Sequence, residues 1–467
     1  MKTRISTTVA QAVTTLTFCA VCAVGIARST TPSGPACSSS AGPDIVVPKP
    51  TAAQAAWQDL DFGILFSFDQ RIYENTRAEY TTPAKVHANP QAYADQFNPR
   101  HLDTDQWIAV AKSMGANHAI LTAKHWLGFC QWQSEANPYS MKHISWKDGK
   151  GDLVKSFTDS CRKQGLSAGI FTEASEDIRL KVHHFKVSKG SPLTQADYDR
   201  MVAKELEELC TQYGPLCELW YDMREGPCTE PFRAIISKHQ PNAVFYGPDY
   251  RWGGGREDGQ VGYPCWATFS WIPLNPSLLR TGDLTSTNWC PARADAPLRY
   301  RNGSHYWYWH PNCENGVATL SQLQQMYYGS VGRNAKLVIG LTPDRDGLIP
   351  APDAARCKEF GDWLQKIFGG KPLAETAGKG RDFTLDIPAD NRIPVTHLIL
   401  QEAIKNGERV REYVVDAEIN GSWKPVGSGT CIGHKRIEKI EPCTARKFRL
   451  RIIQAVGEPQ IREFSVR

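Results

Sequence analysis

The sequence predicts an α/β protein in which a (β/α)8-like barrel is followed by a C-terminal β-sandwich domain. Helical periodicity alternates with short apolar strands over residues 55–370. Polar side chains directly follow several of these strands, which is the edge of a barrel where ligand sites are built. After residue 369 the helical patterns stop, and short alternating strands separated by turn residues follow. These three observations define the predicted architecture.

The barrel elements follow one another as helix and strand pairs. Several predicted helices end at a glycine, including Gly115, Gly165 and Gly214, as helices commonly do. The strands are short apolar runs, typical of parallel strands that are buried on both faces. The predicted pairs are helix 105–114 with strand 118–123, helix 152–163 with strand 167–172, helix 197–213 with strand 217–221, helix 231–239 with strand 243–246, and helix 320–329 with strand 336–340.

Charged or imidazole side chains stand where these strands end. They are Lys124, His125, Glu173, Asp222 and Asp249. A doubly wound open sheet would also bring such residues together, but no G-x-G-x-x-G motif follows a strand here. We therefore favour the barrel.

The C-terminal region, residues 378–467, has the sequence pattern of a β-sandwich. Its strands are short, often alternate between apolar and polar residues, and are separated by turn residues. The predicted strands are 383–387, 396–401, 411–419 and 447–453.

Residues 1–27 have the pattern of a secretory signal peptide. Lys2 and Arg4 precede a short apolar run that ends in small residues, and the run is too short to span a bilayer. Residues 28–54, rich in Ser, Pro and Gly, are predicted to be a flexible leader. We expect a secreted or extracellular protein with no membrane association; a lysosomal or vacuolar destination is the alternative.

The cysteines and two glycosylation sequons fit an exported protein. Removing residues 1–27 leaves twelve of the fourteen cysteines, an even number, so disulfides are expected. Cys431 and Cys443, both in the late β-rich region, are plausible partners. Sequons begin at Asn302 and Asn420. Cys130 lies within an apolar motif and is expected to be a free thiol.

The composition argues against nucleic-acid binding. The formal net charge is +5, and the basic residues are dispersed along the chain rather than clustered. The chain contains 14 Trp, 16 Tyr and 17 Phe, and many of them lie in short polar segments. Aromatic side chains in such places either form core or stack on flat ligands such as sugars.

Two carboxylates could carry chemistry at the barrel rim. Asp222 ends an apolar strand, and Glu257 lies in a glycine-rich loop, residues 251–259. Retaining glycoside hydrolysis needs one ionised and one protonated carboxyl group about 5–5.5 Å apart. From the local pattern alone, a helix cap or one half of an ion pair is the commoner role for an aspartate such as Asp222.

Five ordered motifs resemble the retaining α-L-fucosidases of glycoside hydrolase family 29. They are residues 98–112 (NPRHLDTDQWIAVAK), 121–132 (LTAKHWLGFCQW), 213–222 (YGPLCELWYD), 247–257 (GPDYRWGGGRE), and 307–310 (WYWH) with 328–334 (YGSVGRN). The last two motifs are similar to the branch that acts on α-1,3/4-linked fucose. The resemblance covers roughly residues 55–370.

The resemblance implies a (β/α)8-like catalytic barrel, no metal, no cofactor and double displacement on a fucosylated glycan. Asp222 would be the nucleophile and Glu257 the acid/base. Substrate-binding positions carried over from the motifs are Ser67, Glu79, His125, Trp126, Trp132, Phe171, Arg251, Trp252 and Trp307. Trp132, like Trp266, could equally be part of the core.

Several pocket positions depart from the family pattern. Ser67 replaces a histidine that binds fucose, Trp126 replaces a second histidine, and Leu127 replaces an aspartate. Phe171 stands where a tyrosine is usual. Each lost imidazole donor removes a hydrogen bond of about 0.5–1.5 kcal/mol, so either other residues bind the sugar hydroxyls or the substrate is not plain fucose.

One further residue and one residue pair receive a structural interpretation. Glu79 lies near the family's pocket glutamate, but a surface position fits almost as well. His183 and His184 resemble a metal-binding pair, yet the spacing of nearby carboxylates and cysteines does not support a metal site, and a solvent-facing pair is expected.

Three functional hypotheses follow from the sequence. The leading one is a secreted retaining exo-glycosidase that releases terminal α-L-fucose from glycans or glycoproteins. The second keeps that mechanism but acts on another fucose-like L-sugar, because of Ser67 and Trp126. The third is a carbohydrate-binding pseudoenzyme, against which the presence of both Asp222 and Glu257 argues. The oligomeric state and the disulfide connectivity are left open.

Overall fold

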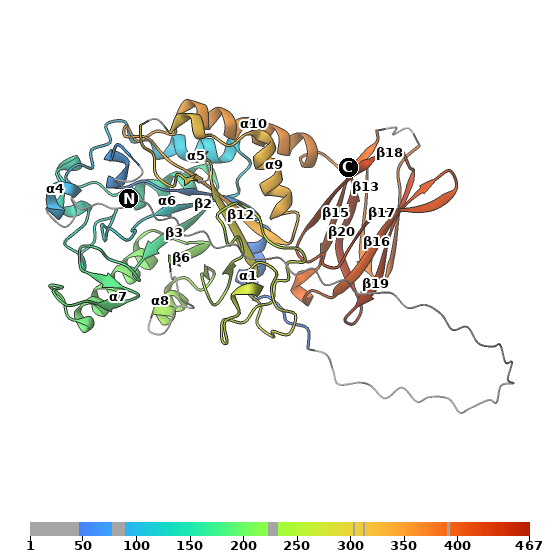
Figure 1. The fold of residues 1–467 in the computed structure, drawn as a ribbon, viewed down its shortest axis with the longest axis horizontal. Helices are drawn as coiled ribbons and strands as arrows, with labels where there is room; N and C mark the ends of the chain where they lie inside the picture. The colour runs from blue at the N-terminus through green and yellow to red at the C-terminus, as the bar shows by residue number, and fades with distance from the viewer. Residues whose placement is uncertain (1–45, 77–88, 223–231, 302–303, 312, 390–392) are drawn as a thin grey trace, which may run out of the picture. The chain divides into compact units, whose positions relative to one another are not determined.

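A sheet of eight parallel strands forms the centre of the larger domain (Figure 1). A computed structural model describes residues 46–76, 89–222, 232–301, 304–311, 313–389 and 393–467, which belong to one compact unit. The strands are β1 (Phe62–Phe66), β2 (His118–Thr122), β3 (Ser167–Glu173), β6 (Glu218–Asp222), β7 (Val244–Phe245), β8 (Arg251–Trp252), β9 (Ala292–Pro297) and β12 (Ala335–Leu341). Their order is β7-β6-β3-β2-β1-β12-β9-β8.

The sheet curls so that its two edges approach each other. Tyr246, just after β7, forms a parallel bridge with Tyr250, just before β8. This bridge connects the edge strands and gives the sheet the topology of the predicted (β/α)8-like barrel. Strands β1, β2, β9 and β12 are buried along their whole length, as expected for parallel strands covered on both faces.

Capping residues mark the ends of the predicted helices. Asp103 caps α5 (Thr104–Ser113) by accepting from the backbone N–H of Gln106, and Asp152 caps α6 (Leu153–Gln164) in the same way. Gly165 ends α6 in the left-handed conformation. The other helices are α1 (Ala52–Asp59), α4 (Pro90–Ala94), α7 (Gln195–Gln212), α8 (Phe232–His239), α9 (Leu320–Gly329) and α10 (Ala351–Phe368).

The barrel departs from a regular (β/α)8 repeat after β7. Only four residues lie between Phe245 and Tyr250, where a regular repeat would have a helix. The next connection, residues 253–291, is a long loop whose helical content is the 3-10 turn Pro276–Leu278. Strand β9 was not predicted, because its sequence ARADAP alternates small residues with the charged Arg293 and Asp295 instead of presenting an apolar run.

The C-terminal domain consists of two four-stranded antiparallel sheets, which confirms the predicted sandwich (Figure 1). One sheet has the order β13-β20-β15-β18 and the other β14-β19-β16-β17. The strands are β13 (Ala374–Lys379), β14 (Asp382–Asp386), β15 (Val395–Glu402), β16 (Val410–Ile419), β17 (Ser422–Gly429), β18 (Arg436–Cys443), β19 (Lys447–Ala455) and β20 (Gln460–Val466). Apolar side chains from both sheets, such as Leu398, Tyr413 and Phe448, form the core between them.

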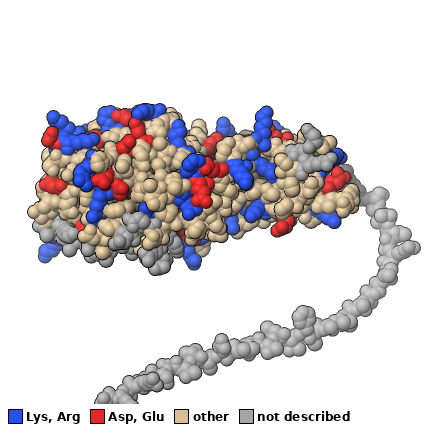
Figure 2. Space-filling model, turned by 90° about the horizontal axis from the view of Figure 1, so that it is seen from above, with Lys and Arg blue, Asp and Glu red and all other residues tan. Residues whose placement is uncertain are grey.

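Ion pairs connect the two domains near the end of α1. Asp59 accepts from His434 over 2.9 Å and from Arg462 over 2.7 Å, and Asp61 pairs with Lys435. The hydrogen bond from His434, together with Arg462, holds the pKa of Asp59 below its usual range. None of the described helices is long and apolar enough to cross a membrane. On the face drawn in Figure 2, basic and acidic side chains are interspersed.

The predicted Cys431–Cys443 disulfide is wrong. Both cysteines are buried free thiols. Cys431 contacts Asn334, whose backbone N–H donates to Lys435, so it lies near the start of β18, whereas Cys443 ends that strand. Seven residue steps of about 3.3 Å separate the two ends of the strand, far beyond the Cα separation of about 7 Å that a disulfide tolerates. Cys130 is a buried free thiol, as predicted.

Candidate active site

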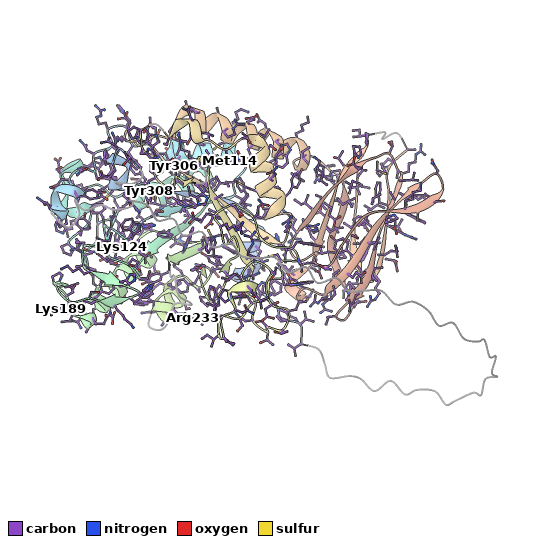
Figure 3. All side chains as sticks on the ribbon, viewed as in Figure 1. Met114, Lys124, Lys189, Arg233, Tyr306 and Tyr308 are labelled. Carbon is purple, nitrogen blue, oxygen red and sulfur yellow. The ribbon has the colours of Figure 1, made fainter. Side chains whose placement is uncertain are left out.

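A cavity of about 500 Å³ opens at the carboxyl ends of the barrel strands. Its walls come from β1, β2, β3, β6, β7, β8 and β9 or from the loops after them, as expected for a barrel active site. The lining residues are Leu65, Ser67, Thr122, His125, Phe171, Trp220, Tyr246, Trp252, Glu257, Arg293, Asp295, Trp307 and Tyr308. Tyr308 is marked in Figure 3. The cavity is therefore predominantly aromatic, with a few acidic and basic groups.

Glu257 reaches the cavity from the loop after β8. Its backbone has a φ of 50°, a conformation that residues other than glycine rarely adopt and that is enriched at functional sites. Its Oε2 lies 2.6 Å from His305 Nδ1 and accepts a hydrogen bond of 2.9 Å from Trp307 Nε1. Both partners come from one segment, residues 304–311, so this segment holds the carboxyl group in place.

Asp222 is the last residue of β6. It is in register with Glu173 at the end of β3, and it follows Trp220, which lines the cavity, by two positions. The side chain of Asp222 lies outside the described residues. The neighbouring Glu173 carboxylate accepts from the backbone N–H of Ser175 over 2.6 Å and from its hydroxyl over 2.7 Å.

His125 is held by two donors and by stacking. Its ring lies nearly parallel to Phe171, with centroids 5.3 Å apart. Its Nδ1 accepts from the backbone N–H of Trp126 over 2.9 Å and is 3.3 Å from Arg71 Nη1. A nitrogen that accepts from two donors is unprotonated, so this network assigns the ring proton of the neutral imidazole to Nε2.

Arg71 is a buried cation behind His125 that the sequence analysis did not single out. Its guanidinium donates to Asp69 and to the hydroxyl of Tyr308, and it lies 3.7 Å from the centre of the Tyr308 ring. Burial disfavours the charged guanidinium, but Asp69, Tyr308 and Tyr93 together raise the pKa of Arg71. Arg71 thus connects His125, Tyr308 and the end of β1.

The second buried ionic group lies on β9 and was also missed. The Arg293 guanidinium stacks 3.5 Å from the ring centre of Trp220 and donates to Tyr250 and Glu218 over 3.1 and 3.4 Å. Burial opposes its charge, but Tyr250 and Glu218 raise the pKa of Arg293. Asp295, two residues along β9, accepts from Trp252 Nε1 over 2.8 Å. A period-two alternation of charged residues with alanine was the available sequence signal.

Comparisons with known proteins show the family of the chain. Residues 52–248 match the family model described as Alpha-L-fucosidase. An α-L-fucosidase-family protein of Bacteroides thetaiotaomicron with a solved structure is 40% identical, with a TM-score of 0.83 over 90% of this chain and 99% of that one. The chain belongs to the α-L-fucosidase family. Alpha-L-fucosidase 1 of Arabidopsis thaliana is 28% identical over 89% of this chain and 87% of the plant protein. A glycoside hydrolase 29 family member from an unknown rumen bacterium is also 28% identical, with a TM-score of 0.76 over 90% of this chain and 77% of that one.

Six residues predicted from the fucosidase motifs meet at the cavity, and others lie elsewhere. Those that line it are Ser67, His125, Phe171, Trp252, Glu257 and Trp307. Trp126 packs beside Tyr93 and Leu127, outside the cavity lining. Trp132 is buried and donates to Glu208 over 2.9 Å, and Trp266 is also buried. Glu79 lies outside the described residues.

Arg251 also lies outside the cavity lining. Its buried guanidinium donates to the backbone carbonyls of Leu279 and Trp266, over 2.9 and 2.8 Å, and to that of Cys290. These contacts hold the long loop between β8 and β9. In this structure Arg251 therefore supports the loop that carries Glu257.

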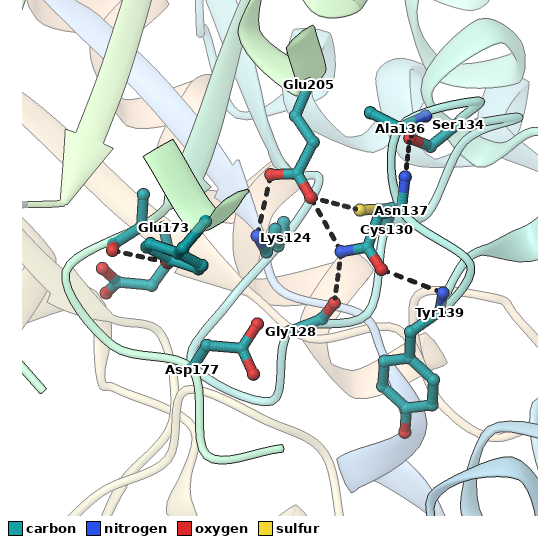
Figure 4. Close-up of polar contacts among 12 residues, drawn as sticks. Lys124, Gly128, Cys130, Ser134, Ala136, Asn137, Tyr139, Glu173, Asp177 and Glu205 are labelled. Carbon is teal, nitrogen blue, oxygen red and sulfur yellow. Dashed lines mark hydrogen bonds and ion pairs between the residues drawn. The ribbon is translucent and has the colours of Figure 1, made fainter. Parts of the chain in front are cut away.

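Lys124, at the end of β2, pairs with a helix rather than with the cavity (Figure 4). Its Nζ donates to Glu205 of α7 over 2.8 Å, and Asn137 donates to the same carboxylate over 2.7 Å. Burial disfavours the Lys124 ammonium, but Glu205, together with Cys130 and Asp177, raises its pKa. The group also contains the free thiol of Cys130, which lies 3.5 Å from Glu205.

His183 is exposed and His184 is half-buried, in line with the expected solvent-facing pair, but the expectation that no carboxylate lies beside them is wrong. Glu176, seven residues before His183, folds back so that its Oε2 lies 2.8 Å from His183 Nδ1. A carboxylate therefore does stand beside the two imidazoles, which local sequence spacing did not indicate.

Proposed function

We propose that this α-L-fucosidase is a secreted, retaining exo-enzyme that removes terminal α-1,3/4-linked fucose from glycans or glycoproteins. Membership of the α-L-fucosidase family supports the fucosidase activity. The observation that carries the mechanism is the Glu257 carboxyl group, held in the cavity by Trp307 and His305. A general acid has to be oriented towards the leaving oxygen before it can transfer a proton efficiently.

In the proposed mechanism, Asp222 attacks the anomeric carbon while Glu257 protonates the oxygen of the departing sugar. A covalent glycosyl-enzyme forms, and Glu257 then removes a proton from the water that hydrolyses it. Because the contacts from His305 and Trp307 both fall on Oε2 of Glu257, we assign the proton transfers to Oε1. The position of Asp222 at the end of β6 supports its role, since barrel enzymes take such residues from strand ends.

The cavity suggests how a terminal sugar is bound. Trp220, Trp307 and Phe171 offer apolar faces for the ring and methyl group of a 6-deoxy sugar. Asp295 offers a buried carboxylate as hydroxyl acceptor, and His125 Nε2 offers a donor. The small Ser67 leaves room that a histidine would fill, which keeps another fucose-like L-sugar as the second candidate substrate.

Two features support the proposed secretion. Residues 1–27 carry the pattern of an export signal. Asn420, which begins one of the glycosylation sequons, lies exposed in the turn between β16 and β17, where a glycosyltransferase could reach it. The other sequon position, Asn302, lies outside the described residues.

The proposal is tested with an aryl α-L-fucoside and a Lewis-type trisaccharide. Asp222→Ala should lower turnover of both by about 1,000-fold or more, and azide should restore turnover of the aryl fucoside by forming the β-fucosyl azide. Asp386→Ala, at an exposed position in the C-terminal domain, is the control and should keep full activity.

Each other outcome has a defined meaning. Unchanged turnover in Asp222→Ala contradicts the assigned nucleophile. Preference for another α-L-glycoside supports the second candidate substrate, and binding without turnover of any L-sugar indicates a pseudoenzyme. Proton NMR of the first product should show the α anomer, and a β anomer contradicts retention.

A further inference from the structure

A small hairpin between β3 and α7 brings together three side chains that could bind a metal ion. It consists of β4 (Val182–His183) and β5 (Lys186–Val187), and Lys189, marked in Figure 3, follows it. The ligand atoms of Glu176, His183 and His184 all lie within 4.8 Å of one another. The His183 and His184 rings are 3.9 Å apart between centroids. We propose that these three side chains form a binding site for a divalent transition-metal ion of the Zn²⁺ class.

The backbone conformation of His184 is what places both imidazoles on one side. Adjacent residues of an extended strand point to opposite faces, so a His-His pair in a regular strand cannot share an ion. His184 and Phe185 instead have φ values of 48° and 63°. This left-handed turn, which is unfavourable for residues with a side chain, rotates the second imidazole towards the first.

The hairpin is held in this shape by contacts that do not involve the three ligands. Asp177 and Val182 exchange two backbone hydrogen bonds of 3.2 and 2.9 Å, and Phe185 donates its N–H to Ser175 over 2.9 Å. Gln195 of α7 bonds to the backbone of Val187 and Phe185, both over 2.9 Å. The ligand set is therefore largely preformed, which reduces the ordering cost of binding.

The ligand types select the class of ion. Two imidazoles and one carboxylate suit Zn²⁺, Cu²⁺ or Ni²⁺, whereas Ca²⁺ and Mg²⁺ prefer sets made of oxygen ligands. Tetrahedral Zn²⁺ with bonds of about 2.0–2.1 Å needs its ligand atoms somewhat further apart than the 2.8 Å between Glu176 and His183. A small rotation of the His183 side chain, which is 64% exposed, provides this space and leaves a fourth position for water.

The site is placed to stabilise the region beside β6. Phe185, next to His184, stacks on Tyr221 with ring planes 9° apart and centroids 6.2 Å apart. Tyr221 directly precedes Asp222 in β6. An ion bound to the hairpin would therefore fix the position of Phe185 against the strand that carries Asp222. The role inferred for the ion is structural, and the proposal does not depend on the proposed substrate.

Calorimetric titration of the full secreted chain with ZnCl₂ tests the site. The protein is produced without a polyhistidine tag and treated with EDTA, which is then removed. One equivalent of Zn²⁺ should bind, and the melting temperature should rise with Zn²⁺. His183→Asn and His184→Asn should each weaken binding by about tenfold or more. His143→Asn, at an exposed histidine outside the hairpin, is the matched control and should bind as the native chain does.

The result that overturns the proposal is equally specific. Binding that is absent at millimolar Zn²⁺, or that is the same in His183→Asn and His184→Asn as in the native chain, contradicts the site. Glu176→Gln provides a second check, because it keeps the shape of the side chain but removes the charge. The melting temperatures of all variants without Zn²⁺ show whether each is folded. If Glu176→Gln does not fold, the exposed His183→Asn variant still decides the question.

Discussion

The indole Nε1 of Trp307 donates to Oε2 of Glu257 over 2.9 Å. The two residues are fifty positions apart and come from different loops, yet this contact and the neighbouring one from His305 hold the proposed acid/base in the cavity. The family motif around Trp307 therefore has a physical explanation here. It positions the carboxyl group of Glu257, whose backbone lies in the strained left-handed region.

Replacing Trp307 with Phe should reduce kcat/KM by about 10- to 100-fold, because the Glu257 carboxyl group loses a hydrogen bond that orients it. The loss should be larger for the trisaccharide than for an aryl fucoside, because a poor leaving group depends more on protonation. Trp309→Phe is the matched control, since Trp309 lies beside Arg345 rather than Glu257. Equal losses for both substrates would argue against a role in acid catalysis.

Asp295→Asn should lower kcat/KM by about tenfold or more, because a charged acceptor for a sugar hydroxyl becomes a neutral one. The asparagine oxygen can still accept from Trp252, so the cavity wall should keep its shape. Steady-state kinetics on the aryl fucoside measure the effect, with Asp283→Asn in the loop between β8 and β9 as control. Native kinetics in Asp295→Asn would remove this residue from sugar recognition.

Arg71→Met should destabilise the protein by about 3–5 kcal/mol, because the buried Asp69 carboxylate loses its partner. Urea unfolding measures the change. Adding Asp69→Asn to this variant should recover part of the loss, since the unpaired charge disappears. Arg200→Met, which breaks an exposed pair with Asp197, should cost less than about 1 kcal/mol. Equal effects of the two arginine substitutions would contradict the importance of the buried pair.

His397 should make stability sensitive to acid. Burial, with a smaller contribution from Lys439, lowers its pKa to about 4, and its Nε2 lies 2.7 Å from the hydroxyl of Tyr328. The unfolded chain then binds a proton that the folded chain does not, so stability is complete above about pH 6.5 and falls as the pH drops towards 4.

Urea unfolding between pH 7 and 4 checks this prediction. The contribution of His397 is at most about 3 kcal/mol, and His397→Asn should remove it and flatten the profile over this range. His143→Asn should leave the profile as it is in the native chain, because His143 is exposed. An identical slope in His397→Asn would contradict the prediction.

Thiol labelling should find the described cysteines other than Cys313 reduced. In the native protein labelling should be slow, because burial disfavours the thiolate and, for example, raises the pKa of Cys265 to about 11. In denaturant without reductant, iodoacetamide should modify all nine, as counted by peptide mass spectrometry. A disulfide-linked peptide containing Cys431 or Cys443 would contradict the structure.

Most of the barrel and half of the sandwich strands could be predicted from local patterns. The helix predicted over residues 320–329 coincides with α9, and the others agree to within about two residues at either end. Strand β9 was missed because its charged side chains are neutralised inside the barrel. Strands β13 and β17 were missed because they lie at sheet edges and carry few buried side chains. Pro425, which cannot donate to a neighbouring strand, is tolerated in β17 for that reason.

The sequence by itself determined the architecture and the family resemblance and supplied the two candidate carboxylates, because periodicity and motifs are local and lie in consecutive residues. Only the tertiary structure decided which side chains share a space. It placed Arg293 and Asp295 at the cavity, left Trp126 outside its lining, and brought Glu176 to His183. Each of these contacts depends on how strands close into a barrel or how a loop turns back, and that geometry is set by packing between distant segments.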